Sequence, residues 1–333
     1  MLGKHAGRPT SQGETVAGLL AEDGCAVRLT SSVPNPARRA AAIGRDLVRW
    51  RGDLDVVVVQ VFSGRAFAHA DLASSLARRL GLSVVLHLHG GNLPAFTRRW
   101  PRWVDRVLRR ADRIVAPSDY LARTFRARGW TVVVVPNTLP VATYPHRHRS
   151  RVEPTLLWMR AFEPLYRPLL AVQAHELVCR RLPAATLTLA GPDGTELTAV
   201  RTLADRLGVA DSLRLPGFLG DRAKRQALAD HDIMLTTSEV DNTPVSVLEA
   251  AACGLPVVAA AVGGMADLLT HDHDGLLVAS DPRSLADAVL RLVDEPALAA
   301  TLSANGRRLA EGFDWPAVRP RWHALLAGLP RRG

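Results

Sequence analysis

The sequence is poor in lysine, cysteine and tyrosine. Its 42 basic side chains include only two lysines, Lys4 and Lys224, and aromatic residues make up 5% of the 333 residues. Hydrophobic residues reach 47% and charged residues 22%, a balance that excludes a disordered chain, a collagen and a coiled coil. A chain of this length can bury a large core, and we expect it to form two domains.

Long apolar runs are also missing. The longest, residues 54–62 and 255–262, are well short of the ~20 residues that cross a bilayer, and no apolar signal segment follows Met1. The three cysteines, at positions 25, 179 and 253, are spaced neither for a zinc site nor for a disulfide framework. These absences predict a cytoplasmic protein with reduced thiols.

The net charge of +10 originates in the first part of the chain. Residues 1–140 contain 21 Lys and Arg against 10 Asp and Glu, whereas residues 141–333 contain 21 against 22. A basic domain of this kind suggests an anionic partner, which can be a phosphate-bearing substrate, a membrane surface or nucleic acid. Few aromatic residues accompany the basic ones as stacking platforms, so we expect no nucleic acid partner.

Strand and helix patterns alternate along most of the chain. Strands are predicted by β-branched or continuous apolar runs at residues 54–62, 83–89, 113–116, 132–135, 155–159, 186–190, 213–215, 232–236 and 256–260. Helices are predicted between them at residues 71–80, 97–110, 118–128, 168–181, 195–207, 221–229 and 245–252. This alternation is typical of open parallel sheets covered by helices.

Periodicity is lost over residues 141–153 and then starts again. We interpret this segment as a linker between a Rossmann-like domain at 1–140, whose first strand is cut short, and a second at 154–310. A last helix in 311–333 is expected to cross back to the first domain. The predicted fold is α/β, with two doubly wound domains facing across a cleft and the ligand beyond the carboxyl ends of the strands.

The segment from Ser238 to Ala250 carries the most information about function. A helix is expected to begin at Pro244, where a missing N–H costs nothing, after a cap at Asn242 or Thr243. The N–H groups and positive dipole end of its start suit a diphosphate. The predicted diphosphate-binding residues are Asn242, Thr243, Pro244 and Val245.

Two acids belong to this segment. Asp241 precedes the predicted helix and Glu249 lies inside it, so one acid can reach a sugar and the other a ribose, with the phosphates between. A capped helix with two solvated acids explains the spacing equally well.

The ordered motifs resemble the retaining, GT-B-fold glycosyltransferases of family 4. Asp241 and Glu249 match the family signature of an acid, seven residues and a glutamate, and Gly263-Gly264 follows. Further matches lie at residues 113–118, 135–137, 189–194 and 215–217. The resemblance covers most of the chain and implies a metal-independent hexosyltransferase of polysaccharide biosynthesis, with a nucleotide diphosphate sugar as co-substrate and no other cofactor.

The resemblance also implies roles for four residues of the second domain. Glu249 would bind the ribose hydroxyls, and Asp241 would act in catalysis on hydroxyls of the transferred sugar. Arg160 would pair with the diphosphate. Arg167 stands near the position of a family lysine that this chain does not have, although it also fits an exposed turn.

In the first domain the resemblance assigns the active-site histidine to His89. His87 and His89 are expected to point to opposite faces of their strand, so that only one enters the site, unless both are simple strand-end residues. Gly90 and Gly91 would let a ligand approach the backbone closely. The loop for phosphate and acceptor is predicted at Gly7, Thr10, Ser11 and Gly13, with a capping box from Ser11 to Glu14 opening the first helix.

Two other features favour ordinary structural roles. The acidic pairs Asp53/Asp55 and Asp272/Asp274 resemble metal-binding pairs, but they fit a strand start and a polar turn, so we expect no metal. The helix predicted at 97–110 combines an apolar stripe with arginines, as in helices that lie on anionic membranes. Packing of that stripe on the sheet is an equally good explanation.

These observations favour a glycosyltransferase that moves a hexose to a glycan, a lipid-linked glycan or a small acceptor. Peripheral contact with the inner face of an anionic membrane is part of this expectation. The alternatives are a nucleotide-sugar epimerase of the GT-B fold, and a non-enzymatic basic protein that binds an anionic surface or nucleic acid.

Overall fold

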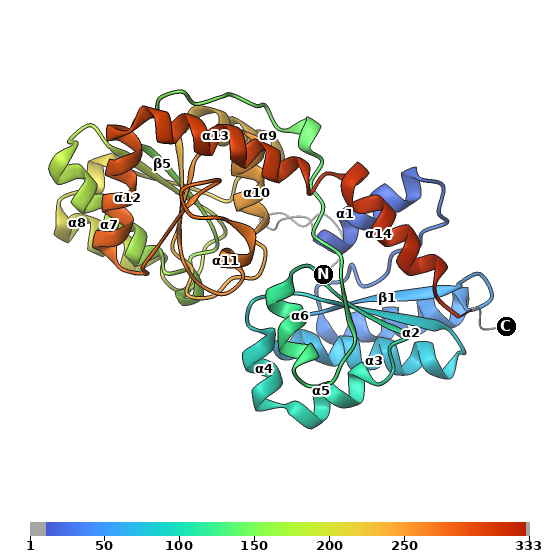
Figure 1. The fold of residues 1–333 in the computed structure, drawn as a ribbon. Coiled ribbons are helices and arrows are strands. Elements are labelled where there is room, and N and C mark those ends of the chain that lie inside the picture. The colour runs from blue at the N-terminus through green and yellow to red at the C-terminus, as the bar shows by residue number, and fades with distance from the viewer. Residues whose placement is uncertain (1–10, 331–333) are drawn as a thin grey trace. The chain divides into compact units, whose positions relative to one another are not determined.

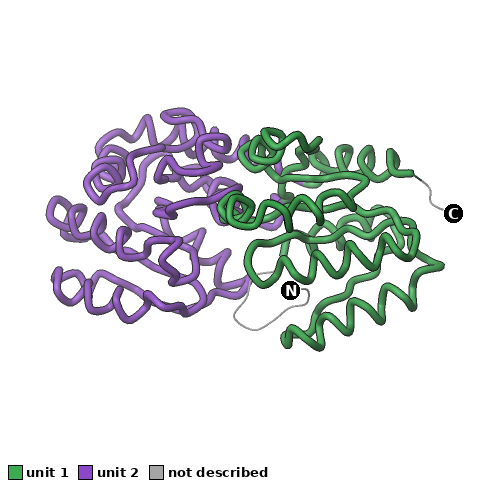
Figure 2. Tube along the Cα trace, turned by 90° about the horizontal axis from the view of Figure 1, so that it is seen from below, with its two compact units in different colours: residues 1–5, 9–138, 315–333 green, residues 6–8, 139–314 purple. Residues whose placement is uncertain are grey.

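A computed structural model describes residues 11–330, which form two compact units. Within that range, unit 1 comprises residues 11–138 and 315–330, and unit 2 comprises residues 139–314. The chain therefore passes from one unit to the other after Thr138 and returns after Asp314 (Figure 2). The predicted loop residues Gly7 and Thr10 lie outside the described residues, and so do residues 1–3, where the first strand that we expect to be cut short would lie.

Unit 1 contains a sheet of parallel strands in the order β1-β2-β3-β4 (Figure 1). The strands are β1 (Val56–Val61), β2 (Ser83–Leu88), β3 (Arg113–Ala116) and β4 (Val132–Val134). The helices are α1 (Gln12–Glu22), α2 (Pro36–Trp50), α3 (Phe67–Arg79), α4 (Leu93–Arg99), α5 (Pro101–Leu108), α6 (Asp119–Arg126) and α14 (Trp315–Ala327), with a 3₁₀ turn η1 (Gly64–Ala66).

Both faces of this sheet are covered, because successive strand residues point to opposite sides. Val84 and Leu86 of β2 belong to the core that includes α3 and α5, whereas Val85 belongs to a second core with α1 and α14. The last helix thus lies in unit 1, where Nε1 of Trp315 donates to a carboxylate oxygen of Asp23 at 3.1 Å.

The single helix predicted over residues 97–110 is wrong. The structure has two helices, α4 and α5, separated at Trp100, whose backbone is not helical (φ −128°, ψ 51°). Pro101 explains the break, because a proline disfavours the helical conformation in the residue before it. Val104 and Val107 are buried in the core of unit 1, while Trp100 is 48% exposed, so the expected continuous apolar stripe does not exist.

Unit 2 contains a larger parallel sheet in the order β10-β9-β8-β5-β6-β7 (Figure 1). The strands are β5 (Thr155–Met159), β6 (Thr186–Ala190), β7 (Leu213–Gly217), β8 (Ile233–Thr236), β9 (Val257–Ala260) and β10 (Leu276–Val278). The helices are α7 (Pro168–Arg181), α8 (Leu197–Leu207), α9 (Asp221–Asp230), α10 (Val245–Ala252), α11 (Met265–Leu268), α12 (Pro282–Asp294) and α13 (Pro296–Glu311). Three 3₁₀ turns are η2 (Val141–Thr143), η3 (Pro164–Tyr166) and η4 (Ala210–Ser212).

The two parallel sheets with their helices confirm the predicted α/β class. In unit 2 the alternation of side chains separates two cores: Leu156 and Trp158 of β5 face the side of α7 and α12, and Leu157 faces the side of α10. None of the helices among residues 11–330 is long and apolar enough to cross a membrane.

The segment interpreted as a linker, residues 141–153, is packed into unit 2. Arg149 is fully buried, and its guanidinium donates to the carbonyl oxygens of Leu228 (2.9 Å), His231 (2.7 Å) and Cys253 (2.5 Å). Burial lowers the pKa of Arg149 to about 10. This segment is therefore held by individual side-chain contacts with unit 2. Such contacts impose no repeating sequence pattern, which explains why the segment has no periodicity.

Candidate functional site

The strand order of unit 2 reverses between β5 and β8, because the chain after β5 continues to β6 on one side and returns to β8 on the other. In parallel sheets, loops diverge at such a reversal and leave a crevice beyond the carboxyl ends of the two strands. Arg160 directly follows β5, and the signature segment from Ser238 onward follows β8. The topology thus brings two predicted site regions to the same edge of the sheet.

Arg160 and Asp241 meet at this edge as an ion pair. Nη2 of Arg160 lies 2.5 Å from Oδ2 of Asp241, and each side chain is 15% exposed. Oδ1 of Asp241 accepts from the backbone N–H of Asn242 at 3.0 Å, which fixes the plane of the carboxylate. Nε of Arg160 is buried without a hydrogen-bond partner among the residues that the structure describes.

Glycines allow the backbones of Arg160 and Asp241 to approach their neighbours closely. A Cβ at Gly191 would lie 1.7 Å from the carbonyl oxygen of Arg160, and one at Gly263 would lie 2.2 Å from that of Asp241. A Cβ at Gly264 would lie 2.1 Å from the carbonyl oxygen of Asn242. Larger residues at these positions would displace the loops that hold the ion pair.

Helix α10 begins one residue later than expected. Pro244 has an extended backbone (φ −70°, ψ 117°) and is the N-cap, and its carbonyl oxygen accepts from the N–H of Val247 at 3.1 Å. The prediction of Asn242 or Thr243 as the cap is therefore wrong, because the chain turns into the helix only after the proline. The N–H groups of Val245 and Ser246 lie in the first turn, where a helix offers them no carbonyl.

Glu249 projects from α10 into a contact that the sequence did not predict. Its Oε1 accepts from Nζ of Lys224 at 2.5 Å and from Oη of Tyr144 at 2.8 Å. Lys224 comes from α9, and Tyr144 comes from the segment interpreted as a linker. The scarcity of lysine was the one signal that could have directed attention to Lys224.

Unit 1 contains the predicted histidine, and here one expectation is wrong. His87 and His89 point to the same side, with ring centroids 4.0 Å apart, because residues two apart on a strand share a face. Nε2 of His89 lies 2.5 Å from Oε1 of Gln60 on β1, and burial lowers the pKa of His89 to about 3. The imidazole is therefore neutral near pH 7.

The start of α1 lies next to this histidine. A Cβ at Gly13 would lie 2.7 Å from the side chain of Gln60, so the absence of a side chain at Gly13 allows the contact between Gln60 and His89. Ser11 caps α1 in a capping box with Glu14, which confirms that prediction. Gly90 has a left-handed backbone (φ +85°).

Two family models match the chain. The model described as Glycosyltransferase Family 4 matches residues 12–143, and the model described as Glycosyl transferases group 1 matches residues 146–309. The first ends close to the end of unit 1, and the second contains the ion pair and Glu249. The chain belongs to the GT-B glycosyltransferases.

Named relatives agree with this family, and solved structures share its fold. The D-inositol 3-phosphate glycosyltransferase of Kineococcus radiotolerans is 34% identical over 64% of this chain, which spans 56% of that relative's length. The enzyme of the same name from Frankia alni is 28% identical over 85% of this chain and 79% of its own. The structure of Anabaena HepE in complex with UDP-glucose has a TM-score of 0.76, with 18% identity over 98% of both chains. The sucrose-phosphate synthase of Thermosynechococcus elongatus has a TM-score of 0.73, with 18% identity over 86% of this chain and 76% of that one.

Arg167, the residue near the position of the family lysine, has its guanidinium in contact with Ser280. Its backbone is left-handed (φ 49°, ψ 56°), and Nη1 donates to Oγ of Ser280 at 2.7 Å. Its carbonyl oxygen accepts from Oγ1 of Thr237 at 3.0 Å, which ties the start of α7 to the segment after β8. These contacts connect segments of unit 2, and donor binding by Arg167 stays a prediction.

Three of the four acids in the pairs Asp53/Asp55 and Asp272/Asp274 have partners within the protein. A carboxylate oxygen of Asp53 lies 3.2 Å from Arg28, one of Asp272 lies 2.6 Å from Arg291, and one of Asp274 accepts from the N–H of Thr270 at 2.7 Å. Among residues 11–330, no group of three or more His, Cys, Asp and Glu side chains is arranged to hold a metal.

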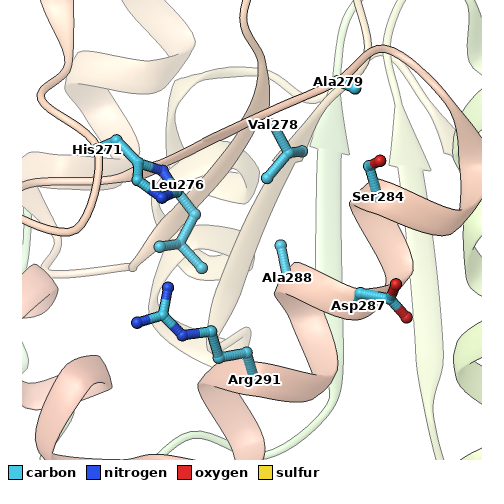
Figure 3. Close-up of a pocket in the computed structure, with 8 residues that line it drawn as sticks. All are labelled: His271, Leu276, Val278, Ala279, Ser284, Asp287, Ala288 and Arg291. Carbon is cyan, nitrogen blue, oxygen red and sulfur yellow. The ribbon is translucent and has the colours of Figure 1, made fainter.

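A pocket of about 390 Å³ lies elsewhere in unit 2, between β10 and α12 (Figure 3). It is lined by His271, Leu276, Val278, Ala279, Ser284, Asp287, Ala288 and Arg291. Its cation, Arg291, is already paired with Asp272 and with Glu295 at 3.1 Å. None of the eight lining residues belongs to the signature segment, so we do not assign the donor site to this pocket.

Proposed function

We propose that this glycosyltransferase moves a hexose from a nucleotide diphosphate sugar to an acceptor hydroxyl, with retention of anomeric configuration and without a metal. The ion pair of Arg160 and Asp241 carries the proposal. In this pair a cation and an acid lie beside each other, at the reversal of strand order and before the start of α10, and this arrangement supports a site for a diphosphate and a sugar. The name of the structural neighbour with UDP-glucose supports the donor class.

The reaction breaks the bond between the anomeric carbon and the β-phosphate oxygen, and the bonding electron pair stays on that oxygen. An acceptor oxygen forms the new bond on the same face of the sugar, and its proton passes to the departing diphosphate. Negative charge therefore grows on the leaving group. Arg160 and the N–H groups at the start of α10 can stabilise this charge, which is the work that a metal ion performs in other enzymes.

The acids of the signature would hold the two ends of the donor. Glu249 would accept hydrogen bonds from the ribose hydroxyls, and Asp241 would accept them from the transferred hexose. Arg160 would exchange its contact with Asp241 for a contact with the diphosphate. A guanidinium suits this task because its planar donors match two phosphate oxygens at once.

For unit 1 we propose that His89 binds a hydroxyl of a reacting sugar. Because Nε2 donates to Gln60, the neutral ring has Nδ1 available as an acceptor. Ser11, Gly13, Gly90 and Gly91 would shape the acceptor and phosphate loop with Gly7 and Thr10.

The proposed acceptor carries a phosphate. The first 140 residues hold a basic excess of 21 against 10, and the named relatives act on inositol 3-phosphate. A lipid-linked phosphate glycan and a small phosphorylated polyol share this chemistry. Contact with an anionic membrane is part of the proposal, since exposed Trp100 has the guanidinium carbon of Arg99 at 5.8 Å from its ring centroid, with Arg98 and Arg102 exposed nearby.

The test is a donor screen followed by product analysis. Calorimetry with UDP, GDP, ADP and their common sugars, with and without EDTA, should reveal one nucleotide diphosphate whose affinity the chelator does not change. Incubation with inositol 3-phosphate or with a polyprenyl phosphate sugar should then yield a product whose anomeric configuration is that of the donor. Inversion, a need for metal, or epimerised donor without transfer would contradict the proposal, the last in favour of an epimerase.

Glu249→Ala serves as the site control for this screen. We expect it to weaken binding of the selected nucleotide diphosphate more than tenfold, equivalent to about 1.4 kcal/mol, while leaving the fold intact by circular dichroism. Unchanged affinity in this variant would place the donor elsewhere.

A further inference from the structure

Lys224 is the only lysine among residues 11–330. Its shortest contact is with Glu249, the second acid of the signature. Nζ of Lys224 lies 2.5 Å from Oε1 of Glu249 and 4.0 Å from Asp221, one turn earlier in α9. The lysine side chain is 22% exposed and that of Glu249 is 8% exposed, so the pair is largely shielded from solvent. Such a charge-assisted contact holds a carboxylate more firmly than a neutral one.

Tyr144 reaches the same oxygen from another part of unit 2. Its Oη donates to Oε1 of Glu249 at 2.8 Å, and Nζ of Lys224 lies 6.0 Å from the tyrosine ring centroid. Burial and the neighbouring carboxylate of Glu249 raise the pKa of Tyr144, so its hydroxyl keeps the proton that it donates. Two donors from separate segments therefore converge on one oxygen of Glu249.

The second oxygen of this carboxylate is left for a ligand. Oε2 of Glu249 accepts no hydrogen bond from any of residues 11–330, whereas Oε1 accepts two. A buried carboxylate with one oxygen fixed and one available is preorganised to receive hydroxyl groups. Lys224 also balances the negative charge of Glu249, so that an incoming diphosphate does not meet an uncompensated anion.

We infer that Lys224 and Tyr144 are positioning residues that orient Glu249 Oε2 toward the ribose hydroxyls of the donor. The inference rests on the proposed function and adds to it, because it assigns recognition of the ribose to a triad and not to one acid. Lys224 acts on the nucleotide through Glu249. Its position also differs from that of the family lysine, which lies near Arg167.

The closing experiment compares ribose selectivity in Lys224→Met and in wild type. Calorimetry is carried out with UDP, GDP and ADP and with the 2′,3′-dideoxy analogue of whichever binds. We expect Lys224→Met to weaken binding of the ribonucleotide about tenfold and of the dideoxy analogue less than twofold, so that the ribose preference is lost. Lys224→Arg should retain most of the ribose preference. In Tyr144→Phe, the logarithm of the affinity ratio between the ribonucleotide and its dideoxy analogue should fall by about half.

Arg225→Met, the neighbouring cation on α9, is the matched control and should leave both affinities unchanged. If Lys224→Met loses equal affinity for the ribonucleotide and for its dideoxy analogue, or keeps the ribose preference, the inference is overturned and the proposed function is not. A loss confined to the diphosphates, with unchanged affinity for the free nucleoside, would overturn it in favour of direct phosphate binding. If wild type binds none of the three nucleotides, the proposed function falls together with the inference.

Discussion

Asp241 and Arg160 neutralise each other across the reversal of strand order in unit 2, at 2.5 Å between Oδ2 and Nη2. The two residues are 81 positions apart in the sequence, and the parallel pairing of β5 with β8 brings them together. In our proposal a donor places its diphosphate against Arg160 and its hexose against Asp241. Each group then exchanges an internal partner for a ligand, and the two substitutions should have different effects.

Arg160→Ala should weaken binding of the donor more than tenfold, because the diphosphate loses a charge-assisted contact worth about 1.4 kcal/mol or more. Asp241→Asn should mainly lower kcat, and it should bind the nucleoside diphosphate without sugar at least as tightly as wild type, because Arg160 is released from its partner. Calorimetry with the nucleoside diphosphate and steady-state kinetics measure the two effects. Tenfold weaker binding of that nucleotide to Asp241→Asn would contradict this assignment.

Gly263→Ala should damage the site beyond its effect on stability. Gly263 has a left-handed backbone (φ +55°), and an added Cβ would lie 2.2 Å from the carbonyl oxygen of Asp241. Gly208, the C-cap of α8, also has positive φ (+71°) but open space around its Cβ position. Both alanine variants should lose about 1 kcal/mol of unfolding free energy from backbone strain, but only Gly263→Ala should lose most of its kcat/KM.

Thermal melts and donor kinetics on the two glycine variants give the comparison. Equal activity in Gly263→Ala and Gly208→Ala would show that the loop before α10 tolerates the displacement.

Acidification should destabilise unit 1 through its two buried histidines. Burial lowers the pKa of His89 to about 3, and burial with the neighbouring His89 lowers the pKa of His87 well below its ordinary value. The unfolded chain takes up protons on both residues near pH 6.5, while the folded protein does not. The free energy of unfolding therefore keeps its full value above about pH 6.5 and falls as pH decreases from there toward 3.

Urea unfolding at several pH values between 7.5 and 4.5 measures this slope. His87→Leu should reduce it by up to about 1.4 kcal/mol per pH unit, because one of the two neutral histidines is removed. A slope identical to that of wild type would mean that His87 takes up its proton in the folded state.

Trp100→Ala should weaken binding to anionic vesicles. The indole is 48% exposed beside exposed arginines, in the position of an interfacial anchor. Sedimentation with phosphatidylglycerol vesicles should show several-fold less bound protein than wild type, and wild-type binding should fall as salt is added. Val48→Ala, at another exposed apolar residue, should bind as wild type does; equal losses in both variants would exclude a specific anchor.

Much of the fold followed from local patterning. The helix predicted at 168–181 and the strands predicted at 113–116, 155–159 and 186–190 have the observed bounds. The helix shows the helical period in its apolar residues, and the strands are short apolar runs. The prediction of one helix over residues 97–110 missed the break at Trp100, although Pro101 indicates it. The expectation that His87 and His89 point to opposite faces was wrong, because residues two apart on a strand lie on the same face.

The candidate site was predicted only in part. Asp241, Glu249 and Arg160 were identified because their segments match family motifs, whereas Lys224 and Tyr144 belong to no motif that we quoted. Their contacts with Glu249 join positions 25 and 105 residues apart. Arg167 shows the opposite case, a residue in a suggestive position whose guanidinium is held by Ser280.

The sequence by itself determined where strands and helices alternate, where the acid signature lies and how basic the first part of the chain is, because these properties depend on neighbouring residues. Only the tertiary structure decided which cation faces which acid, and that residues 141–153 are anchored in unit 2. Such contacts depend on strand order and on the packing of distant segments. A pattern of neighbouring residues does not contain that information.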